Sequence, residues 1–216
     1  MYTLLKADAI AAVRKNLDEV GLNESVVYND ENVDNDSLDL TIAKSLPEAI
    51  NDVHLTAPVQ MLEGEKVDNI SECSVSGRVL SFSLDERYLR LVAFRAADSP
   101  YVVSEVISEY SPEGRKQLNP YVRGTWDKPR LVLLQDKLRP ASFRYYTLKD
   151  DKYENYPFGA IADLSIIREQ VYSPTATGYP VSAVLRENIL LHLTGLVLAI
   201  YGENEKANYF LEKAKV

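Results

Sequence analysis

Apolar residues recur at three- and four-residue spacing along the N-terminal part of the chain, and the first run stops at Gly21. This spacing predicts an amphipathic helix over 4–20. A second run over 38–53, with a cap at Asp36 or the serine after it, predicts another helix. Pro47 lies inside the second run, so we expect a kink or a break there.

The middle of the chain changes to a β-rich pattern with a period of two. The stretch 88–94 predicts a strand, and 131–135 with 142–148 predict a hairpin with a basic tip. The stretch 100–110 fits either a short helix or another strand, and 161–171 mixes apolar and charged residues without a clear period. We therefore expect a sheet in this region.

The last part of the chain returns to a helical pattern. Apolar residues nearly encircle the stretch 182–199, Gly202 ends it, and 203–215 predicts a shorter helix with one apolar side. The most apolar run, 189–201, is shorter than the roughly 20 residues that span a membrane. We expect this run to be a helix buried in the protein and predict no membrane partner.

These elements predict an α+β fold with two parts. Residues 1–65 and 181–216 would form a helical bundle from the N- and C-terminal helices, and residues 66–180 would form a central β-rich lobe inserted into it.

Composition is that of a globular protein, with 216 residues, 46% of them hydrophobic and 26% charged. The N-terminus lacks the apolar core and cleavage site of a secretory signal, so we expect a cytoplasmic product. A single cysteine, Cys73, excludes an intrachain disulfide and indicates a reducing compartment.

Charge is unevenly distributed along the sequence. The net charge is -8, yet residues 1–65 hold 4 basic and 13 acidic side chains, whereas residues 78–149 hold 13 basic and 8 acidic ones. The acidic total argues against a general nucleic-acid binder. The two segments would complement each other between neighbouring copies, as a head-to-tail assembly requires.

Motifs of catalysis and cofactor binding are missing. The two histidines, His54 and His192, belong to no recognisable nucleophile–base pattern, and we interpret His192 as a core or interface residue. The acidic stretch 29–36 lacks the glycine and the final glutamate of a calcium loop, so we interpret it as a solvated loop. The glycines never form a phosphate loop. We predict no enzyme, no cofactor and no metal.

Basic and aromatic residues alternate in the middle segment. We interpret this as strand alternation, with aromatic side chains inward and arginines outward, and a nucleic-acid surface is the alternative. The residues that we expect to make contacts between proteins lie in this basic segment and in the acidic stretch near the N-terminus. They are Arg115, Lys116, Arg123, Lys128, Arg130, Lys137, Arg139, Asp30, Glu31, Asp34 and Asp36.

The order of features resembles a known family in three places. These are the two N-terminal helices ending near Ala57-Pro58; the run 88–95 (YLRLVAFR) followed by 117–125 (QLNPYVRGT) and Lys128-Pro129; and the C-terminal runs 185–190 (LRENIL) and 203–210 (ENEKANYF). Together they resemble the adaptor or ring proteins of bacteriophage head–tail connectors, including those of crAss-like phages. One departure is the run 80–87, which replaces a Leu-Pro-x-Asp-Phe sequence typical of the family.

The resemblance implies a structural virion protein that is assembled in the host cytoplasm. It implies a homo-oligomeric, dodecameric ring between portal and tail, with portal and other connector or tail proteins as partners. DNA would pass through the channel without sequence-specific binding. The alternative is a non-enzymatic binding module that contacts nucleic acid or protein through the basic middle segment.

Overall fold

The chain divides into two compact units in the computed structural model. The terminal unit comprises Met1–Glu63 and Gln170–Val216, and the central unit comprises Gly64–Glu169. The described residues are 1–19, 35–67, 69–84, 87–134, 141–149 and 151–216. The side chains of residues 18, 19, 35–37 and 151 lie outside this description.

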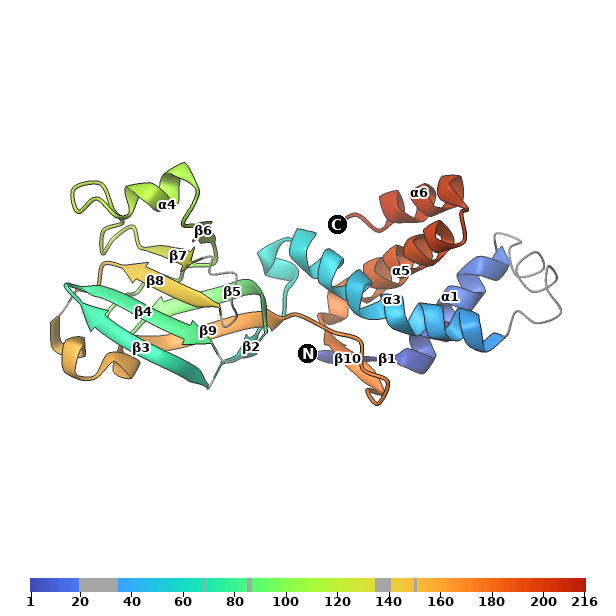
Figure 1. Cartoon of the computed structure of the whole chain (residues 1–216), viewed down its shortest axis with the longest axis horizontal. Helices are drawn as coiled ribbons and strands as arrows, with labels where there is room; N and C mark the ends of the chain where they lie inside the picture. The colour runs from blue at the N-terminus through green and yellow to red at the C-terminus, as the bar shows by residue number, and fades with distance from the viewer. Residues whose placement is uncertain (20–34, 68, 85–86, 135–140, 150) are drawn as a thin grey trace. The chain divides into compact units, whose positions relative to one another are not determined.

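The terminal unit contains helices and a small sheet (Figure 1). Its elements in chain order are β1 (Tyr2–Leu5), α1 (Lys6–Glu19), α3 (Asn35–Thr56), the 3-10 turn η1 (Val59–Met61), β10 (Gly178–Val181), the 3-10 turn η4 (Ala183–Leu185), α5 (Arg186–Ile200) and α6 (Asn204–Lys213). β1 and β10 form an antiparallel pair in which Tyr2 lies opposite Val181.

Helix α5 is the central helix of the terminal unit, in contact with α1, α3 and α6. Its side chains Ile189, Leu193 and Val197 are fully buried. The Asn16 side-chain amide donates to the hydroxyl oxygen of Thr194 at 2.9 Å, which links α1 to α5. The close packing of these helices explains why the C-terminal run is apolar around most of its circumference.

One described stretch, Ala183–Ile200, has the length and apolar composition that would allow it to cross a membrane. In this fold 44% of the stretch is buried within the protein. The central helix of a globular fold and a membrane-spanning helix can share this length and composition, so these two properties do not distinguish between them.

Helix α3 continues through Pro47 without a break, contrary to one of the two alternatives expected from the sequence. Pro47 is buried, and its neighbours Leu46 and Ile50 are fully buried as well. Tertiary packing along this face holds the helix together despite the backbone hydrogen bond that proline cannot donate.

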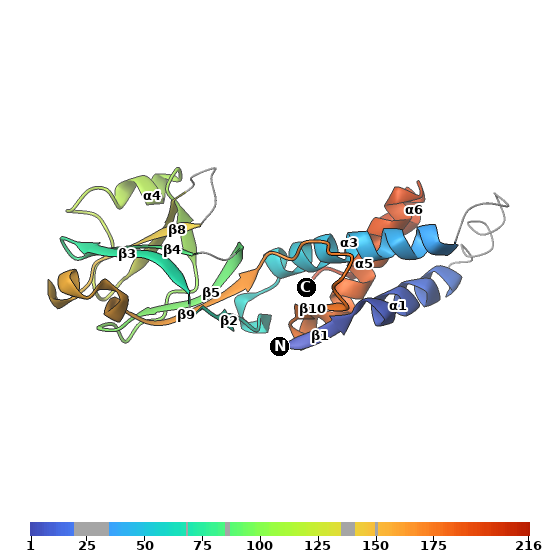
Figure 2. The ribbon, with the colours of Figure 1, turned by 60° about the horizontal axis from the view of Figure 1, so that its bottom comes forward.

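The central unit is built from two sheets (Figures 1 and 2). A three-stranded sheet has the order β2-β9-β5, and a five-stranded sheet has the order β3-β4-β8-β7-β6. The strands are β2 (Glu65–Lys66), β3 (Ile70–Ser76), β4 (Val79–Leu84), β5 (Tyr88–Ala96), β6 (Val106–Ser108), β7 (Arg130–Leu134), β8 (Ser142–Tyr146) and β9 (Ile161–Arg168). The other elements are α4 (Pro112–Lys116) and the 3-10 helices η2 (Asp151–Asn155) and η3 (Pro157–Ala160).

An aromatic core joins the two sheets of the central unit. The Phe94 ring of β5 stacks on Phe82 of β4 with 5.4 Å between centroids, and Phe82 stacks on Phe143 of β8 at 5.2 Å. Tyr145 lies 5.0 Å from Phe94 and is buried, whereas Arg144 between Phe143 and Tyr145 is half-buried. Phe143 and Tyr145 therefore point into this core, as the alternation in the sequence predicts, whereas Tyr146 lies on the other face of the strand and is buried as well.

The hairpin β3–β4 turns through two residues with positive φ, Gly77 at 55° and Arg78 at 66°. Two such residues form the tight turn whose twist matches that of the flanking strands. β3 begins at Ile70, so this hairpin precedes 88–94, the first strand expected from the sequence.

The expected architecture, a bundle of N- and C-terminal helices with one β-rich lobe, is wrong. The protein is a mixed α+β fold in which strands form three sheets, and one of them, β1–β10, lies in the unit that holds the terminal helices. Helical turns also occur in the central unit, at α4, η2 and η3. The strands β1 and β10 have four residues each, which is too short for a period of two to stand out in the sequence.

Candidate functional site

The most distinctive surface of the central unit surrounds β6, the last strand of the five-stranded sheet. β6 lies parallel to β7, with Val106 opposite Leu131 and Ser108 opposite Leu133. Helix α4 lies on the β6 side of this sheet, away from β3 (Figure 1). We call residues 105–130 the β6–α4 segment.

Local hydrogen bonds fix α4 beside β6. The Ser111 hydroxyl accepts from the Gly114 N–H at 3.0 Å and donates to the Ser108 carbonyl at 2.7 Å, so one side chain caps the helix and ties it to the strand. Pro112 occupies the first turn, where its missing N–H costs nothing. Gly114 is buried against the backbone of Ser108.

The stretch after α4 is held by the buried side chain of Gln117. Its carbonyl oxygen accepts from the Gly124 N–H at 2.6 Å, and its amide donates to the Glu113 carbonyl at 3.1 Å. Gly124 in turn accepts, through its carbonyl, the Thr147 hydroxyl at 2.6 Å. These bonds fasten an irregular stretch to the sheet, which gives Arg123 a defined position.

A turn at Thr125–Lys128 completes the β6–α4 segment. The Thr125 hydroxyl donates to the Asp127 carboxylate at 2.5 Å, and this hydrogen bond lowers the pKa of Asp127. The Trp126 indole N–H donates to the Asp98 carbonyl at 3.1 Å, and the Lys149 ammonium lies 4.9 Å from the centre of the indole. The tryptophan therefore anchors the turn.

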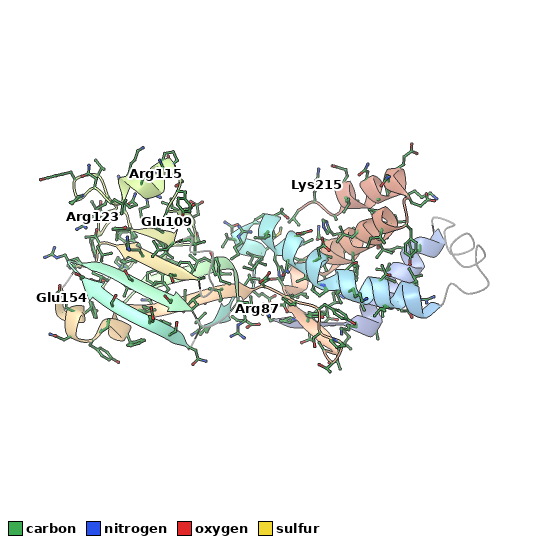
Figure 3. All side chains as sticks on the ribbon, in the orientation of Figure 1. Arg87, Glu109, Arg115, Arg123, Glu154 and Lys215 are labelled. Carbon is green, nitrogen blue, oxygen red and sulfur yellow. The ribbon has the colours of Figure 1, made fainter. Side chains whose placement is uncertain are left out.

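A cavity of about 890 Å³ opens between β6, α4 and this turn. Three acidic side chains, Glu105, Glu113 and Asp127, lie in its lining together with four basic ones. The basic side chains are Lys116, Arg123, Lys128 and Arg130. Figure 3 shows Arg115, Arg123 and Glu109 around this part of the central unit.

The structure brings together four of the predicted contact residues, Lys116, Arg123, Lys128 and Arg130, around this single cavity. Arg115 is exposed on α4 beside them but does not line the cavity. The other predicted contact residues lie outside the described residues. They are Lys137, Arg139, Asp30, Glu31 and Asp34, together with the side chain of Asp36.

Sequence reasoning missed the apolar part of this surface. Tyr110, Leu118, Tyr121 and Val122 are all exposed, and Tyr121 reaches 94% exposure. The run Leu118–Val122 contains no regular apolar period, so its exposure could not be read from the sequence. Such a group of exposed apolar side chains, bordered by charges, is typical of a protein contact surface.

A second cavity, of about 560 Å³, lies in the terminal unit and is mostly apolar. It is lined by the end of α3, by α5 and by the residues at and after the end of α6, and it contains Asp52 and His192. The His192 Nε2 lies 3.3 Å from an Asp52 carboxylate oxygen. No nucleophile of the serine or cysteine kind lines this cavity among the described residues.

Within the described ranges, no group of three or more histidine, cysteine or acidic side chains is placed to hold a metal ion. Cys73 on β3 is half-buried, and burial raises the pKa of its thiol to about 11. A thiol with that pKa is largely protonated at neutral pH and is a poor nucleophile.

The two units differ sharply in charge. Residues 1–63 and 170–216 hold 8 basic and 16 acidic side chains, while residues 64–169 hold 16 of each. The whole net charge of -8 therefore belongs to the terminal unit. Within the neutral central unit, residues 115–130 hold five basic side chains and one acidic side chain.

No protein-family model matches the chain, and a search of curated proteins finds no match either.

Proposed function

We propose that the chain is a structural subunit of a virion head–tail connector, assembling as a homo-oligomeric ring between portal and tail around the DNA channel. The observation that carries this proposal is the charge division between the two units. An acidic terminal unit and a basic stretch, 115–130, on the central unit give one chain two complementary surfaces.

Closed rings need two different surfaces on each subunit, because each copy binds its neighbour head to tail. Opposite charges on those surfaces direct the encounter and disfavour contacts between like surfaces. The exposed apolar residues beside the basic stretch supply area that a neighbour can bury. The resemblance of the sequence to connector proteins supports the same function.

Particle size tests this proposal directly. The purified chain would be measured by mass photometry and negative-stain electron microscopy, alone and mixed with the portal and connector proteins encoded near it. We expect closed rings, alone or on the portal. A chain that stays monomeric in every mixture would contradict the proposal.

A second candidate function, a module that contacts nucleic acid, is favoured by one observation. Tyr121 is 94% exposed, and Arg123 follows two residues later in the basic stretch. Exposed aromatic rings beside cations stack on the bases of single strands. This candidate predicts DNA binding by the monomer that weakens steeply with salt, and the Tyr121→Ala change would weaken it.

A further inference from the structure

Residues 118–122 form an exposed apolar projection of the central unit, which we call the apolar knob. Leu118, Tyr121 and Val122 are all exposed, and Tyr121 is the most exposed large hydrophobic side chain among the described residues. Burying one tyrosine side chain removes about 150–250 Å² from water. The apolar knob therefore has contact surface that only another surface can cover.

Local hydrogen bonds hold the apolar knob in one conformation. The Asn119 side-chain oxygen accepts from the Tyr121 N–H at 3.0 Å, and the Asn119 carbonyl accepts from the Arg123 N–H at 3.0 Å. The bond from the Gly124 N–H to the Gln117 side chain, at 2.6 Å, closes the base of the projection. A segment ordered in advance loses little conformational freedom on binding, so more of its contact energy appears as affinity.

The mostly apolar cavity of about 560 Å³ in the terminal unit offers a site of matching size. Helices α3 and α6 both pack on α5, and the cavity lies between the end of α3 and the end of α6, so we call it the α3–α6 cavity. Leu55 of α3 lines it with a half-exposed side chain, and Leu211 and Ala214 line it from the other helix. Apolar cavities of about 300–1,000 Å³ are typical binding sites for groups of this size.

Two polar side chains in the α3–α6 cavity suit a tyrosine in particular. Asp52 and His192 both line the cavity, and the His192 Nε2 lies 3.3 Å from an Asp52 carboxylate oxygen. A tyrosine buries an apolar ring and needs a hydrogen-bond partner for its hydroxyl, which a carboxylate or an imidazole can supply. Tyr121 combines these two requirements with high exposure.

The charges beside the two surfaces are opposite in sign. Residues 115–123 hold three basic side chains and no acidic one. On α3, the exposed Glu48 lies one helical turn before Asp52, so two carboxylates lie on the α3 side of the cavity. The Lys215 ammonium, on the α6 side (Figure 3), is paired with the Glu212 carboxylate at 2.6 Å. Opposite charges direct the encounter of the two surfaces.

We propose that the apolar knob of one copy inserts into the α3–α6 cavity of a second copy, with Tyr121 as the central anchor. The occupant is a second copy because this chain itself carries both complementary surfaces. The contact joins the central unit of one copy to the terminal unit of the next, so it is head to tail and can repeat around a ring. This inference rests on the proposed function and assigns the surfaces through which its subunits join.

A pair of tyrosine substitutions tests the apolar knob in the full chain. Tyr121→Ser removes the anchor, and Tyr156→Ser, at a tyrosine that is 67% exposed beside η3, is the matched control. Self-association would be measured by sedimentation velocity over a concentration series, with thermal melting to confirm folding. We expect Tyr121→Ser to weaken self-association about tenfold or more and Tyr156→Ser to leave it unchanged. Equal effects of the two changes, or no effect of Tyr121→Ser, would overturn the inference.

A second matched pair tests the α3–α6 cavity. Leu55→Arg places a cation in the cavity, where it would occupy space and repel the incoming Arg123. Leu40→Arg is the same change at a similar exposure on the same helix, 45% against 49%, outside the cavity lining. We expect only Leu55→Arg to weaken self-association. A loss in both variants, or in neither, would contradict binding in this cavity.

Photo-crosslinking identifies the contact while the anchor and the cavity keep their wild-type residues. A benzophenone amino acid at the exposed position 122 would be carried by one copy, mixed with isotopically heavy chains. Peptide mapping is expected to find crosslinks to positions 52–56 or 211–216 of the heavy chain. Crosslinks only within one chain, or only to other positions, would overturn the inference. This experiment also decides the matter if a substitution disturbs folding.

The two proposals fail in different ways. Rings that persist in Tyr121→Ser and Leu55→Arg, without crosslinks from position 122 to the α3–α6 cavity, would overturn this contact and leave the ring function standing. Copies that crosslink through the cavity but form only open chains, and never rings, would support the contact and contradict the ring function. A chain that is monomeric at every concentration and in every mixture contradicts both.

Discussion

Gly114→Ala is the sharpest test of how the β6–α4 segment is built. A Cβ at this position would lie 2.1 Å from the Ser108 carbonyl oxygen and 2.9 Å from the Glu109 Cα, and both are backbone atoms. Contacts below 3.0 Å are essentially never seen for real Cβ atoms, so α4 must move away from β6. The movement would also pull the Gly114 N–H away from the Ser111 hydroxyl, now 3.0 Å distant.

Helix propensity predicts that Gly114→Ala raises stability, whereas packing predicts that it lowers stability. Alanine favours a helix over glycine by about 1 kcal/mol. Overpacking against backbone costs about 1–3 kcal/mol, and loss of the Ser111 cap about 1 kcal/mol more. We therefore expect the central unit to lose about 1–3 kcal/mol of stability.

Thermal melting followed by circular dichroism measures the effect. For a domain of the size of the central unit, the melting temperature falls by about 4–8 °C for each kcal/mol of stability lost. The control is Glu113→Ala, at an exposed position of the same helix, which should change stability by no more than about 0.5 kcal/mol. Gly114→Ala protein that melts at or above the wild-type temperature would refute the packing of α4 on β6. Self-association should fall together with stability, because α4 carries Lys116.

Three further changes test other parts of the structure. In a urea titration, His54→Ala should destabilise the terminal unit by about 2–3 kcal/mol, since His54 is fully buried with its Nε2 3.5 Å from the Ser182 nitrogen. The control His192→Ala, which removes only a partly exposed contact with Asp52, should cost less than about 1 kcal/mol in that titration. Gly195→Ala should also lower stability, because its Cβ would lie 2.7 Å from the Leu211 Cγ between α5 and α6, and an unchanged melting temperature would contradict that contact. Cys73 should react with iodoacetamide at pH 8 about 100-fold more slowly than a peptide thiol, because burial raises its pKa from 9.0 to about 11. The reaction rate should increase with pH until the pH passes about 11. Equal rates in native and urea-unfolded protein would contradict the burial of Cys73.

The basic stretch 115–130 and the cavity beside it differ in how far the sequence reveals them. The basic stretch 115–130 is continuous in sequence, so its charge is evident from the order of residues alone. The cavity beside it depends on β6 and β7, whose parallel pairing joins residues 106 and 131. Parallel pairing is non-local and leaves no turn signal in the sequence, which is why the position of β6 beside β7 was not predicted.

Helix positions were the part of the fold that the sequence determined well. The pattern of apolar residues predicted α1, α3, α5 and α6, because apolar positions recur at the helical period on α1, α3 and α6 and nearly encircle α5. The strands of the β7–β8 hairpin were predicted from two β-rich runs separated by a short basic loop. The stretch 100–110, open between helix and strand, contains the short strand β6.

Tertiary structure decided what local pattern could not. Pro47 continues a helix because buried neighbours hold both sides of it, and β1 finds its partner β10 from across the whole chain. The net charge and its uneven distribution along the chain are evident from the sequence alone. Only the fold shows that the entire net charge lies in one compact unit, because that unit joins the two ends of the chain. Local periods reveal which face of an element is buried, but only packing determines which elements meet and which edge stays open.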